Sequence, residues 1–265
     1  MVDEKSDRPT ALVTGANRGL GLETARQLQA DGYRVVLTSR TESKGIAAAR
    51  SLDADGKQVS YHQLDVTDQG SIAALAQDLP NLVPRLDVLV NNAGIGSWGG
   101  DRRLAAQTIA TNYFGPRDVT DALLPFIPRG GRIVMVSSGL GELSYLEENL
   151  RARFDSPTLT RPALDSLVAS YLAALDQGAQ KREGWPSSYS VSKVSLNALT
   201  RILGRDLSSK GITVNSVCPG WVRTDMGGRG ASRSVPVGGR SIFLTVKLPA
   251  AATGGFYRDG KRIPW

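Results

Sequence analysis

The sequence has little cysteine, little histidine and no long apolar run, and each scarcity excludes a class of protein. Because Cys218 is the only cysteine, no internal disulfide is possible and no cysteine-rich metal site can form. We therefore expect no metal and a reducing, cytoplasmic setting. No run of 18 apolar residues occurs, and the opening segment MVDEKSDRPT is charged, so neither membrane insertion nor export is expected.

The chain is basic, with a formal charge of +7 and a pI near 9.7, but the charges are scattered. The densest group, Arg223, Arg229, Arg233 and Arg240, alternates with glycine and serine, and no aromatic platform interleaves with it. No nucleic-acid partner is therefore expected. A length of 265 residues with 41% hydrophobic content suffices for one large α/β domain.

Short runs rich in valine, leucine and isoleucine alternate with amphipathic stretches of helical length. The runs cover residues 10–14, 34–38, 86–91, 131–137 and 211–217, and the stretches include 20–31, 69–79 and 103–124. Such runs suit strands that are buried on both faces of a parallel sheet. The alternation predicts an α/β fold, a doubly wound (Rossmann-type) parallel sheet of about seven strands, in one domain spanning residues 1–265.

Two segments depart from this rhythm. Residues 141–185 are too long for an ordinary connection, and the apolar spacing of LEENLRARF and ALDSLVASYLAAL predicts a helical insertion with a joint around Pro157 and Pro162. Residues 223–240 are rich in glycine, serine and arginine. We predict that they form a mobile substrate loop.

A glycine-rich turn, TGANRGLG at residues 14–21, follows the first strand and precedes a helix. Glycines let a backbone approach a pyrophosphate closely, and the start of a helix attracts its negative charge. An isolated match of this kind is equally compatible with a turn that binds nothing. Its placement favours a dinucleotide site, whose candidate residues are Gly15, Asn17, Arg18, Gly19, Leu20 and Gly21.

The end of the second strand predicts which dinucleotide binds. NAD sites carry an acidic residue there for the ribose hydroxyls, whereas this chain has Ser39 and Arg40. A guanidinium suits a 2′-phosphate, and Arg18 is placed to reinforce it, so NADPH/NADP+ is the expected cofactor. Taken singly, each arginine is equally an ordinary solvated charge.

Polar residues also follow the third and fourth strands. Asp65 and Val66 come after the third strand, and Asn92 and Gly94 lie in the NNAG turn after the fourth. Ligands bind outside the carboxyl ends of parallel strands, so these residues are candidates for the adenosine side. Each is also compatible with a turn that only terminates a strand.

Tyr189 and Lys193 are separated by four residues near the start of a predicted helix, which places both on one helical face. The spacing alone is not specific, because Tyr257 and Lys261 repeat it. That copy spans the turn tripeptide Arg258-Asp259-Gly260, where helical pairing is not expected.

Together these motifs resemble the short-chain dehydrogenase/reductase family over almost the whole chain. The residues that carry the resemblance are the glycine loop, NNAG at 91–94, Ser138, Tyr189-x-x-x-Lys193 and Pro219-Gly220. GWPSS at 184–188, CPGWVRTDM at 218–226 and the insertion are similar to the carbonyl reductases of the monomeric type.

The resemblance implies a role for each catalytic position. Tyr189 is the general acid and base, and a nearby ammonium is expected to lower its pKa from the usual value near 10. Lys193 supplies that charge and bonds the nicotinamide ribose. Ser138, rather than Ser137, stabilises the developing charge on the substrate oxygen, and Asn112 holds a water in the proton relay.

The resemblance also assigns the nicotinamide side. Pro219, Val222 and Thr224 match positions around the carboxamide, and Trp221 between them is a candidate apolar wall for the substrate. Three other residues are candidates by type, but we expect each to have a structural role. Trp185 is expected to pack in the core, Cys218 to be a small buried hydrophobe, and His62 to lie on a strand outside the crevice.

The expected activity is NADPH-dependent reduction of a small-molecule ketone, aldehyde or quinone. Two alternatives remain open: an NADP-dependent alcohol dehydrogenase acting oxidatively, and an NADPH-binding sensor without turnover. In relatives the helix that bears the tyrosine commonly packs across a dimer interface. Because the insertion would cover that face, a monomer is expected.

Overall fold

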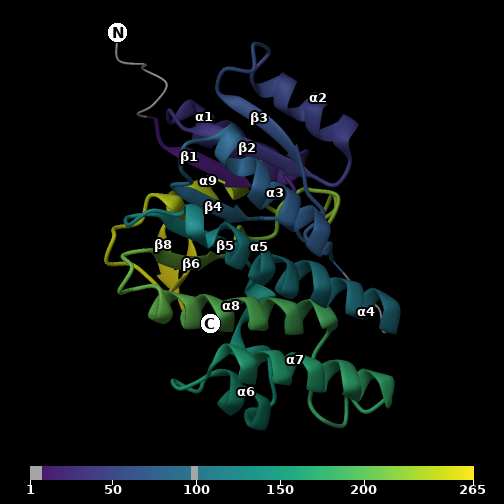
Figure 1. The fold of residues 1–265 in the computed structure, drawn as a ribbon. Helices are drawn as coiled ribbons and strands as arrows, with labels where there is room; N and C mark the ends of the chain where they lie inside the picture. Colours follow the sequence, from purple (N-terminus) through teal and green to yellow (C-terminus); the bar gives the residue numbers. More distant parts are fainter. Residues whose placement is uncertain (1–7, 97–100) are drawn as a thin grey trace.

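The computed structural model describes residues 8–96 and 101–265, which build one sheet between two layers of helices (Figure 1). Most of the charged N-terminal segment that argued against export lies outside these residues. The strand order is β3-β2-β1-β4-β5-β6-β7-β8, and only the last pairing is antiparallel. The strands are β1 (Thr10–Val13), β2 (Arg34–Ser39), β3 (Val59–Gln63), β4 (Val88–Asn91), β5 (Arg132–Val136), β6 (Thr213–Val217), β7 (Phe256–Arg258) and β8 (Lys261–Ile263).

Alternate residues of each central strand face opposite helical layers, as the side-chain period of a strand requires. Ala11 and Val13 pack in one cluster, and Leu12 between them packs in the other. The first layer contains α1 (Gly19–Ala30), α2 (Glu42–Leu52) and α9 (Val235–Val246). The second contains α3 (Gln69–Leu82), α4 (Arg102–Ile109), α5 (Gly115–Leu123) and α8 (Ser188–Asp206). Within the described part of the chain, no helix is long and apolar enough to cross a bilayer.

The doubly wound parallel sheet is confirmed, with eight strands where the sequence predicts about seven. The sheet ends in the hairpin β7–β8, whose strands of three residues are too short to appear as apolar runs. Its turn holds Asp259 at φ 53° and Gly260 at φ 75°. Tyr257 and Lys261 therefore lie on two antiparallel strands, not on one helical face.

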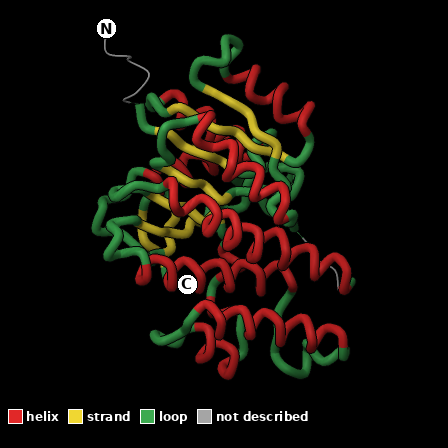
Figure 2. The backbone as a smooth tube through the Cα atoms, in the orientation of Figure 1, coloured by secondary structure: helices red, strands yellow, loops and turns green. Residues whose placement is uncertain are grey.

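The segment 141–185 contains two helices, α6 (Glu148–Phe154) and α7 (Arg161–Asp176), stacked outside α8 (Figure 2). Thr160 caps α7 by accepting from the Ala163 amide, and a proline follows in the first turn. Trp185 is buried between Phe154 and Tyr171, with ring centroids 6.3 and 5.5 Å away. The insertion thus has its own aromatic core, which continues into the main one.

The C-terminal boundary predicted for the loop 223–240 is wrong, because residues 235–240 belong to α9. Gly238 and Gly239, which suggested flexibility, serve close packing instead. A Cβ on Gly238 would lie 2.6 Å from Val222 Cγ2 and 2.7 Å from Leu20 Cδ2. A bridge between Val222 and Arg233 closes the remaining segment at its base.

Candidate active site

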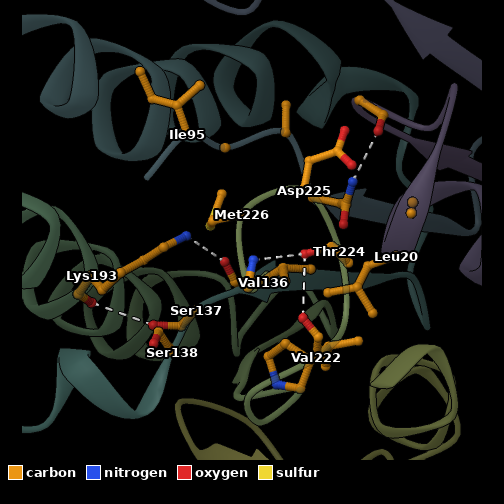
Figure 3. A pocket seen from close by; sticks show the side chains of 18 of the residues that line it. Leu20, Ile95, Val136, Ser137, Ser138, Lys193, Val222, Thr224, Asp225 and Met226 are labelled. Carbon is orange, nitrogen blue, oxygen red and sulfur yellow. Dashed lines mark hydrogen bonds between the residues drawn. The ribbon is translucent and has the colours of Figure 1, made fainter. Parts of the chain in front are cut away.

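A cavity of about 740 Å³ opens at the carboxyl ends of the parallel strands (Figure 3). This is where a doubly wound sheet binds its ligands. Except for Asn112, every residue that the sequence predicts for the site lines it: Gly15, Asn17, Arg18, Gly19, Leu20, Gly21, Arg40, Asp65, Val66, Asn92, Gly94, Ser138, Tyr189, Lys193, Pro219, Trp221, Val222 and Thr224.

The glycine loop is packed too closely for side chains. Gly15 has φ +63°, and a Cβ on it would lie 2.9 Å from Ala93 Cα. A Cβ on Gly21 would lie 2.5 Å from Asn92 Nδ2. The hydroxyl of Thr14 accepts from the amides of Asn92 and Ala93 at 3.0 and 2.9 Å, which ties the end of β1 to the end of β4.

The N-terminus of α1 faces the cavity and fits a diphosphate. Among the described residues, no side chain caps this terminus, and the first turn contains no acidic residue. The amide groups and the positive end of the helix dipole therefore remain available to an anion.

Two arginines line the cavity at the end where a 2′-phosphate is expected. Arg40 is exposed directly after β2, whose last residue, Ser39, is buried and donates its hydroxyl to the Thr41 carbonyl. Arg18 forms an ion pair with Asp225 on the loop after β6. Because these side chains are 72% and 75% exposed, the pair is weak and a bound phosphate can compete with it.

The catalytic candidates come from β5 and α8. Lys193 Nζ donates to the Val136 carbonyl at 2.8 Å (Figure 3). The same Nζ lies 5.7 Å from the centroid of the Tyr189 ring. Ser138 hydrogen-bonds to Tyr189 and also accepts from the Leu140 amide at 3.2 Å. Ser137 instead points its hydroxyl at the Lys193 carbonyl, 3.5 Å away.

Burial dominates the protonation of this pair. It raises the pKa of Tyr189 to about 12, and the hydrogen bond from Ser138 offsets only part of that rise. It lowers the pKa of Lys193 to about 8. In the protein without cofactor, loss of hydration disfavours the charged form of both groups and outweighs the effect of the lysine charge on Tyr189. The lowering expected from the lysine and the nicotinamide charge together stays a prediction.

The buried lysine predicts how stability depends on pH. An unfolded chain keeps a lysine protonated up to about pH 10.4, whereas the folded chain loses this proton near pH 8. The free-energy cost of burying the charged lysine is therefore complete below pH 8 and is relieved as the pH rises toward 10, so the free energy of unfolding should increase by about 3 kcal/mol. Tyr189 acts in the opposite direction between about pH 10 and 12.

We expect denaturant unfolding of wild type and Lys193→Met to show this difference. The free energy of unfolding of wild type should rise relative to the variant between pH 8 and about pH 10. A difference that stays constant over that range would contradict the lowered pKa.

Asn112 is fully buried behind the cavity, in the π-helical turn Ala110–Phe114 that joins α4 to α5. Its Oδ1 accepts from the Ile95 amide at 2.9 Å, and its Nδ2 donates to Ser192 Oγ at 3.1 Å. A Cβ on Gly94 would lie 3.2 Å from Asn112 Oδ1 and 3.8 Å from Lys193 Nζ. Asn112 is thus separated from Lys193 by little more than a glycine backbone.

Sequence reasoning missed several residues of the cavity. Tyr145, Met226 and Arg258 line it beside Trp221, which is 60% exposed and donates its indole N–H to the Gly227 carbonyl at 2.9 Å. Arg258 Nη2 donates to the buried Cys218 Sγ at 3.1 Å. Of the three, only Met226 had a signal, as the last residue of the CPGWVRTDM motif.

The sequence raises two other candidate chemistries, a histidine function and a metal site. His62 bonds to Asp78 at 3.1 Å outside the cavity. In residues 8–96 and 101–265, no group of three or more histidine, cysteine, aspartate or glutamate side chains is arranged to hold a metal ion.

Comparison with known proteins gives concordant matches. The short chain dehydrogenase family profile matches residues 9–149, and a profile described as enoyl-(acyl carrier protein) reductase matches residues 159–237. Carbonyl reductase (NADPH) 1 of Rattus norvegicus is 40% identical over 275 residues, which cover 98% of this chain and 99% of the relative. The Homo sapiens protein of that name is 41% identical over 267 residues, with 96% of each chain covered.

Solved structures show the same likeness. Salutaridine reductase from Papaver somniferum superposes with a TM-score of 0.87 at 31% identity, covering 94% of this chain and 99% of that one. The NADPH-bound carbonyl reductase from chicken fatty liver gives a TM-score of 0.75 at 26% identity, covering 99% and 97%.

Proposed function

This chain belongs to the short-chain dehydrogenase/reductase family and is an NADPH-dependent carbonyl reductase, and from that premise we propose that Tyr189 donates the proton to the substrate oxygen. The observation that carries the proposal is that Ser138, Tyr189 and Lys193 line the same cavity as the glycine loop. The carbonyl oxygen of a ketone, aldehyde or quinone would accept hydrogen bonds from the hydroxyls of Ser138 and Tyr189, which would hold the substrate for reduction.

Each catalytic side chain has a separate task in this proposal. Ser138 donates a hydrogen bond to the carbonyl oxygen as negative charge develops there. Tyr189 protonates that oxygen, and Lys193 orients the ribose and carries charge beside the phenol. Asn112 holds the water through which the proton is replenished. When bound, NADPH supplies the hydride.

The cofactor-binding residues follow the cavity from one end to the other. Arg40 and Arg18 hold the 2′-phosphate, and the amides of the glycine loop hold the diphosphate. Asp65, Val66, Asn92 and Gly94 line the adenosine side, and Pro219, Val222 and Thr224 enclose the carboxamide. Thr224 Cγ2 would lie 3.6 Å from a Cβ on Gly19, so the loop after β6 lies close over the glycine loop.

The substrate end is enclosed by the loop after β6 and by the start of the insertion. Trp221 and Met226 are exposed on the first, and Tyr145 on the second, so three apolar surfaces surround the entrance. We propose that residues 223–234 move when substrate enters.

The first experiment follows NADPH oxidation with a panel of quinones, aromatic aldehydes and ketones, with NADH in parallel and the corresponding alcohols with NADP+. NADPH-specific turnover supports the proposal. Tight binding of NADPH without turnover would favour the sensor alternative, and preference for NADH would contradict the role of Arg40.

We also propose that the protein is a monomer. Helix α7 packs along α8 and α4, and nearly all of α8 is buried within its own chain. The helix that bears Tyr189 therefore offers no face to a second copy. Light scattering should give the 28.2 kDa mass of one chain, and a stable tetramer would contradict this prediction.

A further inference from the structure

We propose that the inserted helix α7 positions the proton relay: Asp165 holds Tyr113, and Tyr113 fixes the π-helical turn that carries Asn112. Asp165 and Tyr113 touch neither substrate nor cofactor in this proposal, so they are positioning residues. The inference rests on the role proposed above for Asn112.

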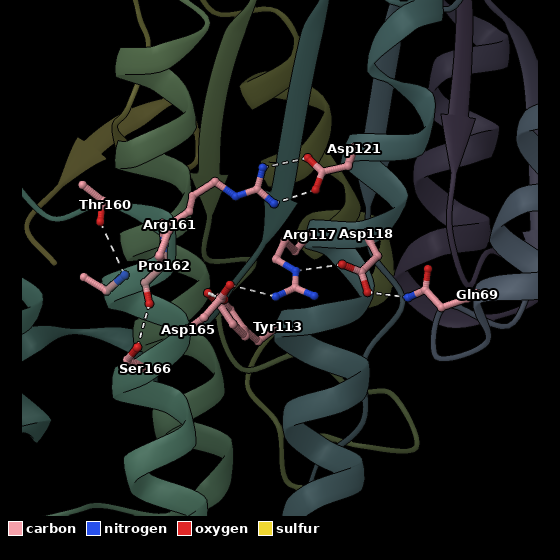
Figure 4. Close-up of polar contacts among 11 residues, drawn as sticks. Gln69, Tyr113, Arg117, Asp118, Asp121, Thr160, Arg161, Pro162, Asp165 and Ser166 are labelled. Atoms are coloured by element: carbon pink, nitrogen blue, oxygen red, sulfur yellow. Dashed lines mark hydrogen bonds and ion pairs between the residues drawn. The ribbon is translucent and has the colours of Figure 1, made fainter.

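The link between the insertion and the turn is direct. Tyr113 Oη donates to Asp165 Oδ1 at 2.6 Å, and Arg117 Nη1 donates to Asp165 Oδ2 at 3.0 Å (Figure 4). Tyr113 is fully buried. Burial and the neighbouring carboxylate raise the pKa of Tyr113 far above its usual value, so the phenol remains a donor at every working pH.

The turn needs such a hold because its geometry is uncommon. A π-helical turn inserts a residue into the α-helical ladder, and such bulges occur mostly at functional sites. If Ala110–Phe114 relaxed to α-helix, side chains beyond the slip would rotate by about 100° per residue around the helix axis. Asn112 would then lose its bonds to Ile95 and Ser192.

Two anchors on consecutive residues prevent this rotation. Asn112 is bonded toward the site, to Ile95 and Ser192, and Tyr113 is bonded away from it, to Asp165. A side chain fixed on each side of the turn sets its register. Removing the outer anchor should leave the cofactor cavity intact but loosen the position of Asn112.

A second side-chain contact between α7 and the helix that follows the π-helical turn provides a matched control. Arg161 of α7 bonds to both oxygens of Asp121 of α5, at 2.9 and 2.5 Å (Figure 4). This pair ties the insertion to α5 through side chains outside the π-helical turn. A loss specific to Tyr113 and Asp165 would therefore reflect the turn, not the docking of α7.

The experiment measures kcat, the Kd of NADPH and the solvent deuterium isotope effect for each variant. Tyr113→Phe and Asp165→Ala should each lower kcat by about tenfold, with the isotope effect raised and the Kd of NADPH within about twofold of wild type. The double variant should lose no more than either single variant, because both remove one link. Asp165→Asn keeps an oxygen acceptor for Tyr113 and should restore most of kcat. Asp121→Ala removes both bonds to Arg161 and should keep wild-type kcat.

Each outcome bears on a specific claim. If Asn112→Ala loses turnover but Tyr113→Phe and Asp165→Ala do not, the inference is wrong and the proposed function stands. If Asn112→Ala is fully active, the relay and the inference both fall. An equal loss in Asp121→Ala would show that α7 acts only by covering α5 and α8, which also overturns the inference.

Discussion

Replacing Tyr189 with phenylalanine is expected to lower kcat for carbonyl reduction by about 10²–10⁴-fold, the range that one general acid contributes. The phenylalanine ring fills the same buried space, and only the hydroxyl bonded to Ser138 is lost. Because that hydroxyl lies at the substrate end of the cavity, the Kd of NADPH should remain close to that of wild type. Single-turnover kinetics and cofactor titration measure the two effects separately.

The second Tyr-x-x-x-Lys pair supplies the control for this substitution. Tyr257→Phe makes the same chemical change on β7, at a buried residue whose partner by spacing, Lys261, lies on the opposite strand of the hairpin. It should keep wild-type kcat. Full activity in Tyr189→Phe would contradict the assignment, and an equal loss in both variants would indicate a stability effect.

The two pairs also show what sequence spacing can and cannot predict. Tyr189 and Lys193 share a helical face because Ser187 caps α8 just before them, accepting from the Ser190 amide at 3.2 Å. Tyr257 and Lys261 are separated by a glycine-containing turn. The turn residues therefore separate the two copies in the sequence, and the structure adds the cap that starts the helix of the first.

The features of the site that the sequence did not predict depend on contacts between segments far apart in the chain. The Arg18–Asp225 ion pair spans 207 positions, and the Tyr113–Asp165 bond spans 52. Neither has a local signature. The glycines at 238 and 239 appeared flexible because their packing against Leu20 and Glu23 of α1 is equally non-local.

The pKa of Tyr189 shows a similar limit of the sequence. Tyr189 and Lys193 lie near one another, 5.7 Å from ammonium to ring centroid, but burial of both groups outweighs the effect of that charge in the protein without cofactor. A burial of that extent follows only from the assembled fold.

Reversing the charge at the end of β2, with Arg40→Asp, is expected to change cofactor preference. Arg40 lies at the edge of the cavity where the 2′-phosphate is expected. Losing a charged hydrogen bond and adding a like charge should raise the KM for NADPH about 100-fold or more. An aspartate there can accept from a ribose hydroxyl, so the KM for NADH should fall. The ratio of kcat/KM for the two cofactors measures the change.

Arg50→Asp is the matched control, because it makes the same charge change in the last turn of α2, on an exposed residue away from the cavity lining. If a general electrostatic field selected NADPH, both variants would shift the ratio alike, and the shift would fade as salt screens the field. A local phosphate contact predicts a large effect at Arg40 and little at Arg50. Arg18→Ala should be intermediate, since Arg18 must leave Asp225 before it can reach the phosphate. An unchanged ratio in Arg40→Asp would show that NADPH is selected elsewhere in the cavity.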